Sequence, residues 1–271
     1  MLVSQFFDLL LQELEENPSL RGYYRFLNEP SKAKFIFRKR YYIQRLEYIA
    51  NNVTKENSMI WDCGCGYGTT AIFLALNGHT VYGNTLEYYF EQIPTRLKFW
   101  SKYGDLSKLK LDYKNHFDIK EKSLYDYVIA QDTLHHLEPI HEALDIINES
   151  MKQGGELIAI EENGKNIFNR TKNYLRRGNK RIIEIYDERL QRNILIGDEN
   201  TRPLKEWQPL LAQSNLHLQQ ESVEYVRLYL PISYKLSSEE ALDKKEKEKW
   251  KTNAFLRKYF YFGTNFVAVK K

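Results

Sequence analysis

Cysteine is scarce in this sequence, and its arrangement excludes two classes of protein. The two cysteines, Cys63 and Cys65, are separated by one residue. This spacing is not typical of a structural zinc site, and two cysteines are too few for the disulfide framework of a small secreted domain. We therefore expect a protein of the reducing cytoplasm, with no bound metal.

Long apolar runs are also missing. The segment VSQFFDLLLQELEENP, residues 3–18, is apolar on one face only, and it is too charged for a signal peptide or a membrane-spanning helix. We expect an amphipathic helix that ends near Pro18. Its four acidic residues are Asp8, Glu13, Glu15 and Glu16.

A strong net charge is the third absence. The 40 basic residues and 36 acidic residues leave a net charge of +4, which is too small to indicate a nucleic-acid partner unless the charges cluster. They do cluster in two stretches without an acidic residue, 31–46 with six basic side chains and 164–183 with seven. The location of the charges is therefore more informative than their sum.

What the sequence does contain is a regular alternation of apolar and amphipathic segments. This alternation is what a parallel sheet with helical crossovers requires, and the 42% apolar composition suffices for one large α/β domain. The expected strands are 59–63, 79–84, 106–113, 125–132, 154–162, 216–230 and 259–271. The expected helices after the first are 35–50, 69–78, 86–104 with a bend at Pro94, 139–152 and 203–215.

The chain is expected to form one domain with insertions, because no glycine-serine linker interrupts it. Residues 1–50 form an N-terminal helical cap, and residues 51–271 form the α/β domain. Within that domain, the polar segment at about 164–201 is an inserted cap. The lysine- and glutamate-rich segment at about 235–253 is a charged insertion, which is most often a solvated helix.

The segment MIWDCGCGYGTT, residues 59–70, carries the strongest functional signal. A predicted strand runs into Asp62 and is followed by three glycines before a helix begins. Because glycine has no side chain, a ligand can approach the backbone closely at the carboxyl end of this strand, where open α/β sheets place their binding sites. A dinucleotide-binding turn is the first alternative, but its G-x-G-x-x-G spacing requires a glycine where this chain has Thr69.

DCGCGYG resembles the glycine-rich first motif, D/E-x-G-x-G-x-G, of class I S-adenosylmethionine-dependent methyltransferases. YDYVIAQDTLHHLEP is similar to the family's fourth-strand motif, and MKQGGELIAIEEN is similar to its fifth strand. The resemblance implies a Rossmann-like α/β fold, with a doubly wound, mostly parallel seven-stranded sheet, a reversed C-terminal strand and helical cap insertions. It also implies S-adenosyl-L-methionine as the cofactor, bound at the turn by Asp62, Gly64, Cys65, Gly66 and Gly68.

The resemblance also indicates cofactor contacts beyond the turn. The segment GNTLE, residues 83–87, lacks the usual acidic residue and is similar to the G-I-T-L-S of lipid-cyclopropanating and related methyltransferases. The candidates are Thr85, Glu87 and Gln92 for the ribose, Asp112 and Tyr113 for the adenine, and Gln131 at the end of the fourth strand. In a purely structural alternative, which involves no cofactor, the ribose candidates only cap the following helix, and Asp112 is a loop residue facing water.

Candidate catalytic residues follow the fourth and fifth strands. His135 and His136 are expected beneath the transferred methyl group, where a histidine is a candidate general base near neutral pH. Glu161 is the candidate at the end of the fifth strand. Because side chains alternate along a strand, only one of Glu161 and Glu162 can face the reaction centre. Asn163 is an alternative polar ligand. Methyl transfer from a sulfonium depends mainly on in-line placement of the two reactants. Correct orientation can lower the activation barrier by about 7–11 kcal/mol, whereas a general base typically raises the rate roughly a hundred- to ten-thousand-fold.

The two basic stretches predict an acceptor that carries a carboxylate, a phosphate or an acyl-carrier group, because in this family both regions usually cover the acceptor side. A small or lipid-like molecule is favoured. Three alternatives stay open. The first is an RNA acceptor, whose phosphates would contact the basic side chains and whose bases would stack on tyrosines such as Tyr41, Tyr42 and Tyr174. The others are a protein acceptor and a non-catalytic module that keeps the nucleoside-binding fold.

Overall fold

The computed structural model describes residues 1–29 and 31–271. The strands of its central sheet are β1 (Met59–Cys63), β2 (Thr80–Thr85), β3 (Leu109–Tyr113), β4 (Tyr125–Gln131), β5 (Met151–Glu162), β8 (Leu216–Val226) and β9 (Gly263–Lys270). They lie in the order β3-β2-β1-β4-β5-β9-β8. β1 to β5 pair in parallel, and β9 runs antiparallel to both β5 and β8. The predicted seven-stranded, mostly parallel sheet with a reversed C-terminal strand is confirmed.

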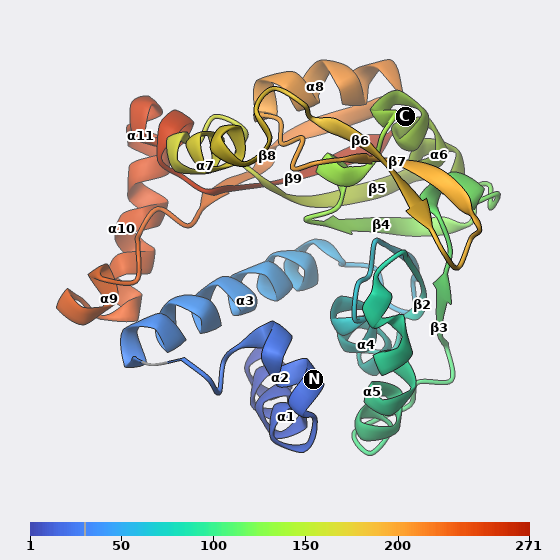
Figure 1. The fold of residues 1–271 in the computed structure, drawn as a ribbon, viewed down its shortest axis with the longest axis horizontal. Coiled ribbons are helices and arrows are strands. Elements are labelled where there is room, and N and C mark those ends of the chain that lie inside the picture. Colours follow the sequence, from blue (N-terminus) through green and yellow to red (C-terminus); the bar gives the residue numbers. More distant parts are fainter. Residues whose placement is uncertain (30) are drawn as a thin grey trace.

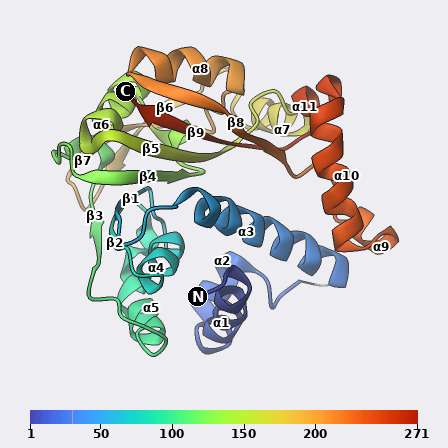
Figure 2. The ribbon, with the colours of Figure 1, turned by 180° about the vertical axis from the view of Figure 1, so that it is seen from behind.

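Helices cover both faces of this sheet (Figures 1 and 2). One face carries α1 (Val3–Glu16), α2 (Pro18–Tyr24), α3 (Lys32–Asn52), α4 (Thr69–Leu76) and α5 (Ile93–Trp100), and the other carries α6 (Ile140–Ser150) and α8 (Leu204–Gln213). Because side chains alternate along a strand, Ile60 packs into the core with α1, α3 and α4, while Trp61 packs into the core with α6 and α8. The amphipathic first helix is confirmed, since Phe6 and Leu10 are buried in the first of these cores.

The helix predicted at 86–104 with a bend at Pro94 is wrong in its first part. A 3-10 turn, η1 (Tyr88–Gln92), comes first, and α5 begins only at Ile93. Pro94 lies in the first turn of α5, where its missing N–H has no intrahelical partner to lose. Proline therefore starts this helix and does not bend a longer one.

The inserted segment at 164–201 contains a helix, α7 (Ile167–Arg177), followed by a two-stranded antiparallel hairpin of β6 (Ile182–Asp187) and β7 (Arg192–Gly197). The sequence analysis did not predict this hairpin. Its strands are short, and most of their residues are exposed or partly exposed, so the alternation that marks a half-buried strand is weak. Figure 1 shows the hairpin beside the sheet, near the ends of β3 and β4.

The charged segment before the last strand folds as α9 (Ser233–Leu236), α10 (Glu239–Thr252) and α11 (Ala254–Tyr259). α10 is mostly solvated, as predicted, but Leu242 and Glu246 are buried. Among residues 1–29 and 31–271, no helix is long and apolar enough to span a bilayer.

Candidate functional site

The turn after β1 brings the ends of β1 and β4 together at the carboxyl edge of the sheet. Gly64 and Gly66 have φ values of 72° and 53°, a left-handed conformation that glycine adopts without steric cost. A Cβ atom on Gly64 would lie 2.5 Å from both Cγ2 and Oγ1 of Thr133, just after β4. A Cβ atom on Gly66 would meet no described heavy atom within 4 Å. The first glycine therefore permits close packing of the chain, and the second leaves free space beside the backbone.

Asp62, near the end of β1, is a buried acid with an unused acceptor. It is only 2% exposed, and its Oδ2 atom has no hydrogen-bond partner among the described residues. Burial raises the pKa of Asp62 to about 7, against the opposing effect of a hydrogen bond from the backbone of Ala71. A buried polar atom without a partner indicates a place where a ligand donates the missing hydrogen bond.

Hydrogen bonds to Asn84 of β2 hold the glycine turn and the end of β1 in place. The N–H of Cys65 donates to the carbonyl oxygen of Asn84 in β2, over 2.9 Å. The buried Asn84 side chain accepts a hydrogen bond from Nε1 of Trp61 at 2.7 Å and donates one to the carbonyl oxygen of Lys114 at 3.0 Å. Gly68 is the N-cap residue of α4. Asn84 was not among the predicted site residues, although it lies within the GNTLE segment that the sequence analysis singled out.

Thr85 ends β2, Glu87 and Gln92 follow it, and Gln131 ends β4; the structure gives some of these side chains structural partners. Oγ1 of Thr85 accepts a hydrogen bond from the backbone N–H of Glu87 at 3.1 Å, which is the kind of local capping expected in the structural alternative. Gln92 ends η1. Oε1 of Gln131 accepts a hydrogen bond from Thr70 at 3.3 Å. Their contacts with a cofactor stay predictions.

Asp112 lies inside β3, within the strand expected at 106–113, so the alternative in which it is a loop residue is wrong. It forms an ion pair with Lys110, two residues earlier on the same strand, at 2.9 Å. Tyr113 ends β3, and its hydroxyl donates a hydrogen bond to Asp187 of β6 at 2.8 Å. The guanidinium of Arg189 lies 4.7 Å from the centroid of the Tyr113 ring. The inserted hairpin therefore covers the end of β3, where the adenine pocket was predicted.

Glu161 organises the loop that follows β4. One carboxylate oxygen accepts the backbone N–H groups of Thr133 and Leu134, at 3.1 and 2.8 Å. The other oxygen accepts a hydrogen bond from Nδ1 of His135 at 2.6 Å. Burial lowers the pKa of His135, but the carboxylates of Glu161 and Asp132 outweigh that effect and raise the pKa to about 9. His135 is therefore protonated at neutral pH and forms a buried ion pair with Glu161.

His136 has the opposite character. Its Nδ1 lies 2.8 Å from the carbonyl oxygen of Gly197, and burial, with the charge of His135, lowers the pKa of His136. His135, His136 and Glu199 each have an atom that could bind a metal ion, and these three atoms lie within 4.8 Å of one another.

The structure adds three residues that the sequence analysis did not assign to the site. Arg45 of α3 is hydrogen-bonded to the hydroxyl of Tyr41 and forms an ion pair with Asp132, the residue that follows β4. The guanidinium carbons of Arg45 and Arg227 lie 3.8 and 3.7 Å from the centroid of the Tyr41 ring. No sequence motif connects positions 41, 45 and 227, because only the tertiary fold brings them together. The clustering of basic residues within 31–46 was the single feature of the sequence that could have indicated this part of the site.

Several of the other basic side chains in the two predicted stretches have structural partners. In the first stretch, Arg38 pairs with Glu29 and Arg40 with Asp243. In the second stretch, Arg176 pairs with Asp198 at 2.5 Å, and Arg177 donates to backbone carbonyl oxygens. Some basic side chains that have no acidic neighbour in their own stretch are therefore neutralised by acids from other parts of the sequence.

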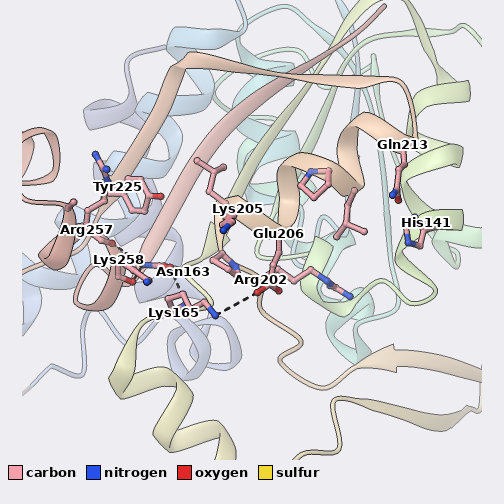
Figure 3. A pocket seen from close by; sticks show the side chains of 15 residues that line it. His141, Asn163, Lys165, Arg202, Lys205, Glu206, Gln213, Tyr225, Arg257 and Lys258 are labelled. Carbon is pink, nitrogen blue, oxygen red and sulfur yellow. Dashed lines mark hydrogen bonds and ion pairs between the residues drawn. The ribbon is translucent and has the colours of Figure 1, made fainter.

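The structure also has a cavity of about 920 Å³ lined by α8, α11 and the residues after β5. Figure 3 shows Lys205 and Glu206 of α8 on one side and Arg257 and Lys258 of α11 on the other, with an ion pair between Lys165 and Glu206. Its lining includes no residue of the glycine turn and none from 131–136. This cavity is therefore separate from the edge where the turn, Asp132 and the histidines lie.

Comparison with known proteins identifies relatives of this fold. A family model described as a methyltransferase domain matches residues 35–221. Solved structures with a similar fold include a SAM-dependent methyltransferase from Methanosarcina mazei, with 18% identity, a TM-score of 0.56, and coverage of 82% of this chain and 96% of that one. No curated protein sequence matches the chain.

Two further similar structures were solved with ligands. The 1,6-didemethyltoxoflavin-N1-methyltransferase of Burkholderia thailandensis, with bound 1,6-didemethyltoxoflavin and S-adenosylhomocysteine, has 13% identity, a TM-score of 0.51, and coverage of 84% of this chain and 77% of that one. Phosphoethanolamine N-methyltransferase 2 of Haemonchus contortus, in complex with S-adenosyl-L-methionine, has 16% identity, a TM-score of 0.56, and coverage of 84% and 52%. At these identities the similarity establishes a shared fold.

Proposed function

Because the chain belongs to the methyltransferase domain family, we propose that it transfers the methyl group of S-adenosylmethionine to a small-molecule acceptor at the carboxyl edge of its sheet. The glycine turn carries this proposal, because Gly66 leaves free space beside the backbone and Asp62 keeps a buried oxygen without a partner. The cofactor supplies a methyl group that its positively charged sulfur has already activated.

The residues of the turn fit this cofactor. The backbone at Gly64 and Gly66 is accessible without side chains, and the unpartnered Oδ2 of Asp62 can accept a hydrogen bond from a donor on the ligand. The proposed ribose contacts are Thr85, Glu87 and Gln92, and Tyr113 beneath the hairpin is the proposed adenine contact. Asp112 is a weaker candidate, because its ion pair with Lys110 already occupies it. Cys65 and Gln131 complete the proposed set.

The acidic and imidazole side chains after β4 and β5 take different roles in this proposal. Glu161 and the protonated His135 are positioning residues, because they fix the loop that carries Thr133 and Leu134. His136 is half-buried and neutral at neutral pH, so it is the candidate proton acceptor. Since correct placement contributes more than a base to this kind of transfer, we expect activity to depend more strongly on Glu161 than on His136.

A small-molecule acceptor is favoured over RNA or protein. The two similar structures with ligands are named for the methylation of small molecules, 1,6-didemethyltoxoflavin and phosphoethanolamine. Six of the 13 basic side chains in the two stretches that favoured RNA are paired with acids or carbonyl groups of this chain, which leaves fewer of them for phosphates. A nucleic-acid acceptor predicts binding that weakens steeply with salt, whereas a small acceptor held in a buried site does not.

The experiment that tests the function is a metabolite screen with isotopically labelled S-adenosylmethionine. The purified protein is incubated with the cofactor and a lysate from which macromolecules have been removed, and products are detected as a mass gain of one labelled methyl group. We expect a labelled small molecule in the filtrate. Label found only in added RNA or protein would contradict the small-molecule acceptor, and calorimetry showing no binding of the cofactor would contradict the function itself.

Cofactor affinity is expected to rise with pH through the titration of Asp62. The folded-state pKa of Asp62, about 7, is above its ordinary value of 3.8 because the carboxylate is buried. Below pH 7 the folded protein therefore holds a proton there, and a ligand that donates to the carboxylate must displace it. Affinity should fall by about tenfold per pH unit below the folded pKa and level off above it.

Calorimetry with S-adenosylmethionine between about pH 5.5 and 8 measures this dependence. Asp62→Asn is the control, because an amide does not titrate in this range, and its profile should be nearly flat. Equal slopes in the wild-type protein and the Asp62→Asn variant would show that another group causes the pH dependence.

A further inference from the structure

Arg227 is a largely buried cation that stacks on Tyr41 and has no ion pair in the described part of the chain. It follows β8, and no described residue is a hydrogen-bond partner of its buried Nε atom. An unpaired charge in a largely buried position destabilises the folded state. A residue that is kept at such a cost to stability is a candidate for ligand binding.

The backbone at Arg227 is also held in an unusual conformation. Its φ is 65°, a left-handed value that is sparsely populated by residues other than glycine and is often found at functional sites. The buried Glu246 of α10 holds this turn, because its carboxylate accepts the backbone N–H groups of Arg227 and Leu228 at 3.0 and 2.8 Å. The position of the guanidinium is therefore fixed by α10 and is not a property of a free loop.

Arg45 approaches the same place from α3. Its guanidinium and that of Arg227 both lie within 4 Å of the centroid of the Tyr41 ring. Burial, followed by repulsion from Arg227, lowers the pKa of Arg45 to about 9. Two guanidinium groups stacked on one ring in a poorly solvated site repel each other, and an anion that both groups bind relieves that repulsion.

The hydrogen-bonding groups without partners at this place indicate which chemical groups a ligand would need. Among the described residues, Nε of Arg45 and Nε of Arg227 are buried donors without acceptors, and Oδ1 of Asp132 is a buried acceptor without a donor. The nearby acids are already engaged: Asp132 pairs with Arg45, Glu161 with His135, and Glu162 accepts a hydrogen bond from Asn169 at 3.0 Å. No acid in residues 1–29 and 31–271 lies within ion-pair distance of Arg227, and Asp132, Glu162 and Glu246 attract it only from farther away.

The position of this pair within the sheet assigns it to the acceptor and not to the cofactor. Arg227 follows β8 at the outer edge of the sheet, and Asp132 follows β4. The glycine turn follows β1 and contacts β2 on the other half of the sheet. Since β4 is the neighbour of β1, Asp132 lies between the two halves, next to the place where the methyl group is delivered.

We propose that Arg227 and Arg45, stacked on Tyr41, clamp a carboxylate or phosphate group of the methyl acceptor, while Asp132 accepts a hydrogen bond from an N–H or O–H group of the same molecule. This inference rests on the proposed function and narrows its substrate class to anionic acceptors. Guanidinium groups suit this task, because their planar fork matches the oxygens of both anions.

Inorganic phosphate is the probe for this site. The unfolding temperature is measured against phosphate concentration for the wild-type protein, for Arg227→Met, and for Arg170→Met, a matched control on the exposed surface of α7. We expect phosphate to stabilise the wild-type protein and Arg170→Met alike, and to act at least about tenfold more weakly on Arg227→Met. The control also reports the general stabilisation that phosphate gives any protein.

Without phosphate, Arg227→Met should be at least as stable as the wild-type protein, because it removes an unpaired charge. Its affinity for S-adenosylmethionine should be within about twofold of the wild-type value. An equal phosphate response in Arg227→Met and the wild-type protein overturns the clamp, and so does a loss of cofactor affinity, since Arg227 would then bind the cofactor. Failure of the proposed function gives a different result, in which the wild-type protein shows no heat with S-adenosylmethionine.

Discussion

Replacing Glu13 with glutamine is expected to destabilise the fold by about 3–5 kcal/mol, because it leaves a buried arginine without its counterion. Glu13 of α1 receives two hydrogen bonds from Arg96 of α5, from Nε and Nη2, both at 2.8 Å. Nε1 of Trp100 donates a third, also at 2.8 Å. Arg96 is fully buried and Glu13 is 2% exposed, so water cannot replace the lost carboxylate.

The effect should extend to the glycine turn. Nη1 of Arg96 donates to the carbonyl oxygen of Tyr67 at 2.8 Å and to Oγ1 of Thr69 at 2.7 Å. Arg96 therefore connects the N-terminal helix to Tyr67 and Thr69, the residues on either side of the last glycine of the turn. We expect Glu13→Gln to weaken the binding of S-adenosylmethionine as well as to lower stability.

Urea unfolding followed by circular dichroism measures the change in stability. Glu16→Gln is the matched control, because Glu16 of the same helix pairs with Lys102 only at 3.8 Å and both side chains are more than half exposed. The loss of an exposed pair of this kind costs about 0–1 kcal/mol. If Glu13→Gln destabilised the protein no more than Glu16→Gln, the buried ion pair would not be a main link between α1 and the sheet.

Gly64→Ala is expected to cost about 2–5 kcal/mol and to abolish cofactor binding. Two effects add: about 1–2 kcal/mol for an L-residue in a left-handed conformation, and about 1–3 kcal/mol for overpacking against Thr133. The contact falls on the Cβ, Cγ2 and Oγ1 atoms of Thr133, whose backbone N–H donates to Glu161. The change therefore displaces the loop that carries both histidines.

Gly154→Ala separates the two effects. Gly154 has a φ of 74°, close to the 72° of Gly64, and a Cβ atom there would meet nothing within 4 Å. It should therefore show only the backbone cost. Equal destabilisation of the two variants in urea unfolding would mean that the packing of the β1 turn against the end of β4 contributes nothing.

Much of the fold was predictable from the sequence, because its signals are local. The strand that enters DCGCGYG is an apolar run that ends in glycines, and the buried parallel strands β4 and β5 have the same apolar character. Errors arose where tertiary contacts decide the outcome. Pro94 suits the start of a helix as well as a bend, and the periodicity of a single segment does not separate these possibilities.

The site was predictable only in its local part. The glycines and Asp62 form one contiguous motif, so composition and spacing sufficed to find them. Glu13 was counted as one of several charges that argue against a signal peptide, yet its side chain is buried, because its partner Arg96 lies 83 residues later. Arg227 and Arg45 are 182 positions apart and share no motif; only the β8 turn and α3, which the fold brings together at Tyr41, make them neighbours.

The central claim is that the backbone of the β1 turn is left bare for a ligand, and calorimetry of Gly66→Ala tests it most directly. This variant should fold as stably as Gly154→Ala, because neither added methyl group meets a protein atom within 4 Å. It should nevertheless bind S-adenosylmethionine at least about tenfold more weakly than the wild-type protein, while Gly154→Ala binds it normally. Unchanged affinity in Gly66→Ala would contradict the account, since the space beside Gly66 would then not be the place where the cofactor lies.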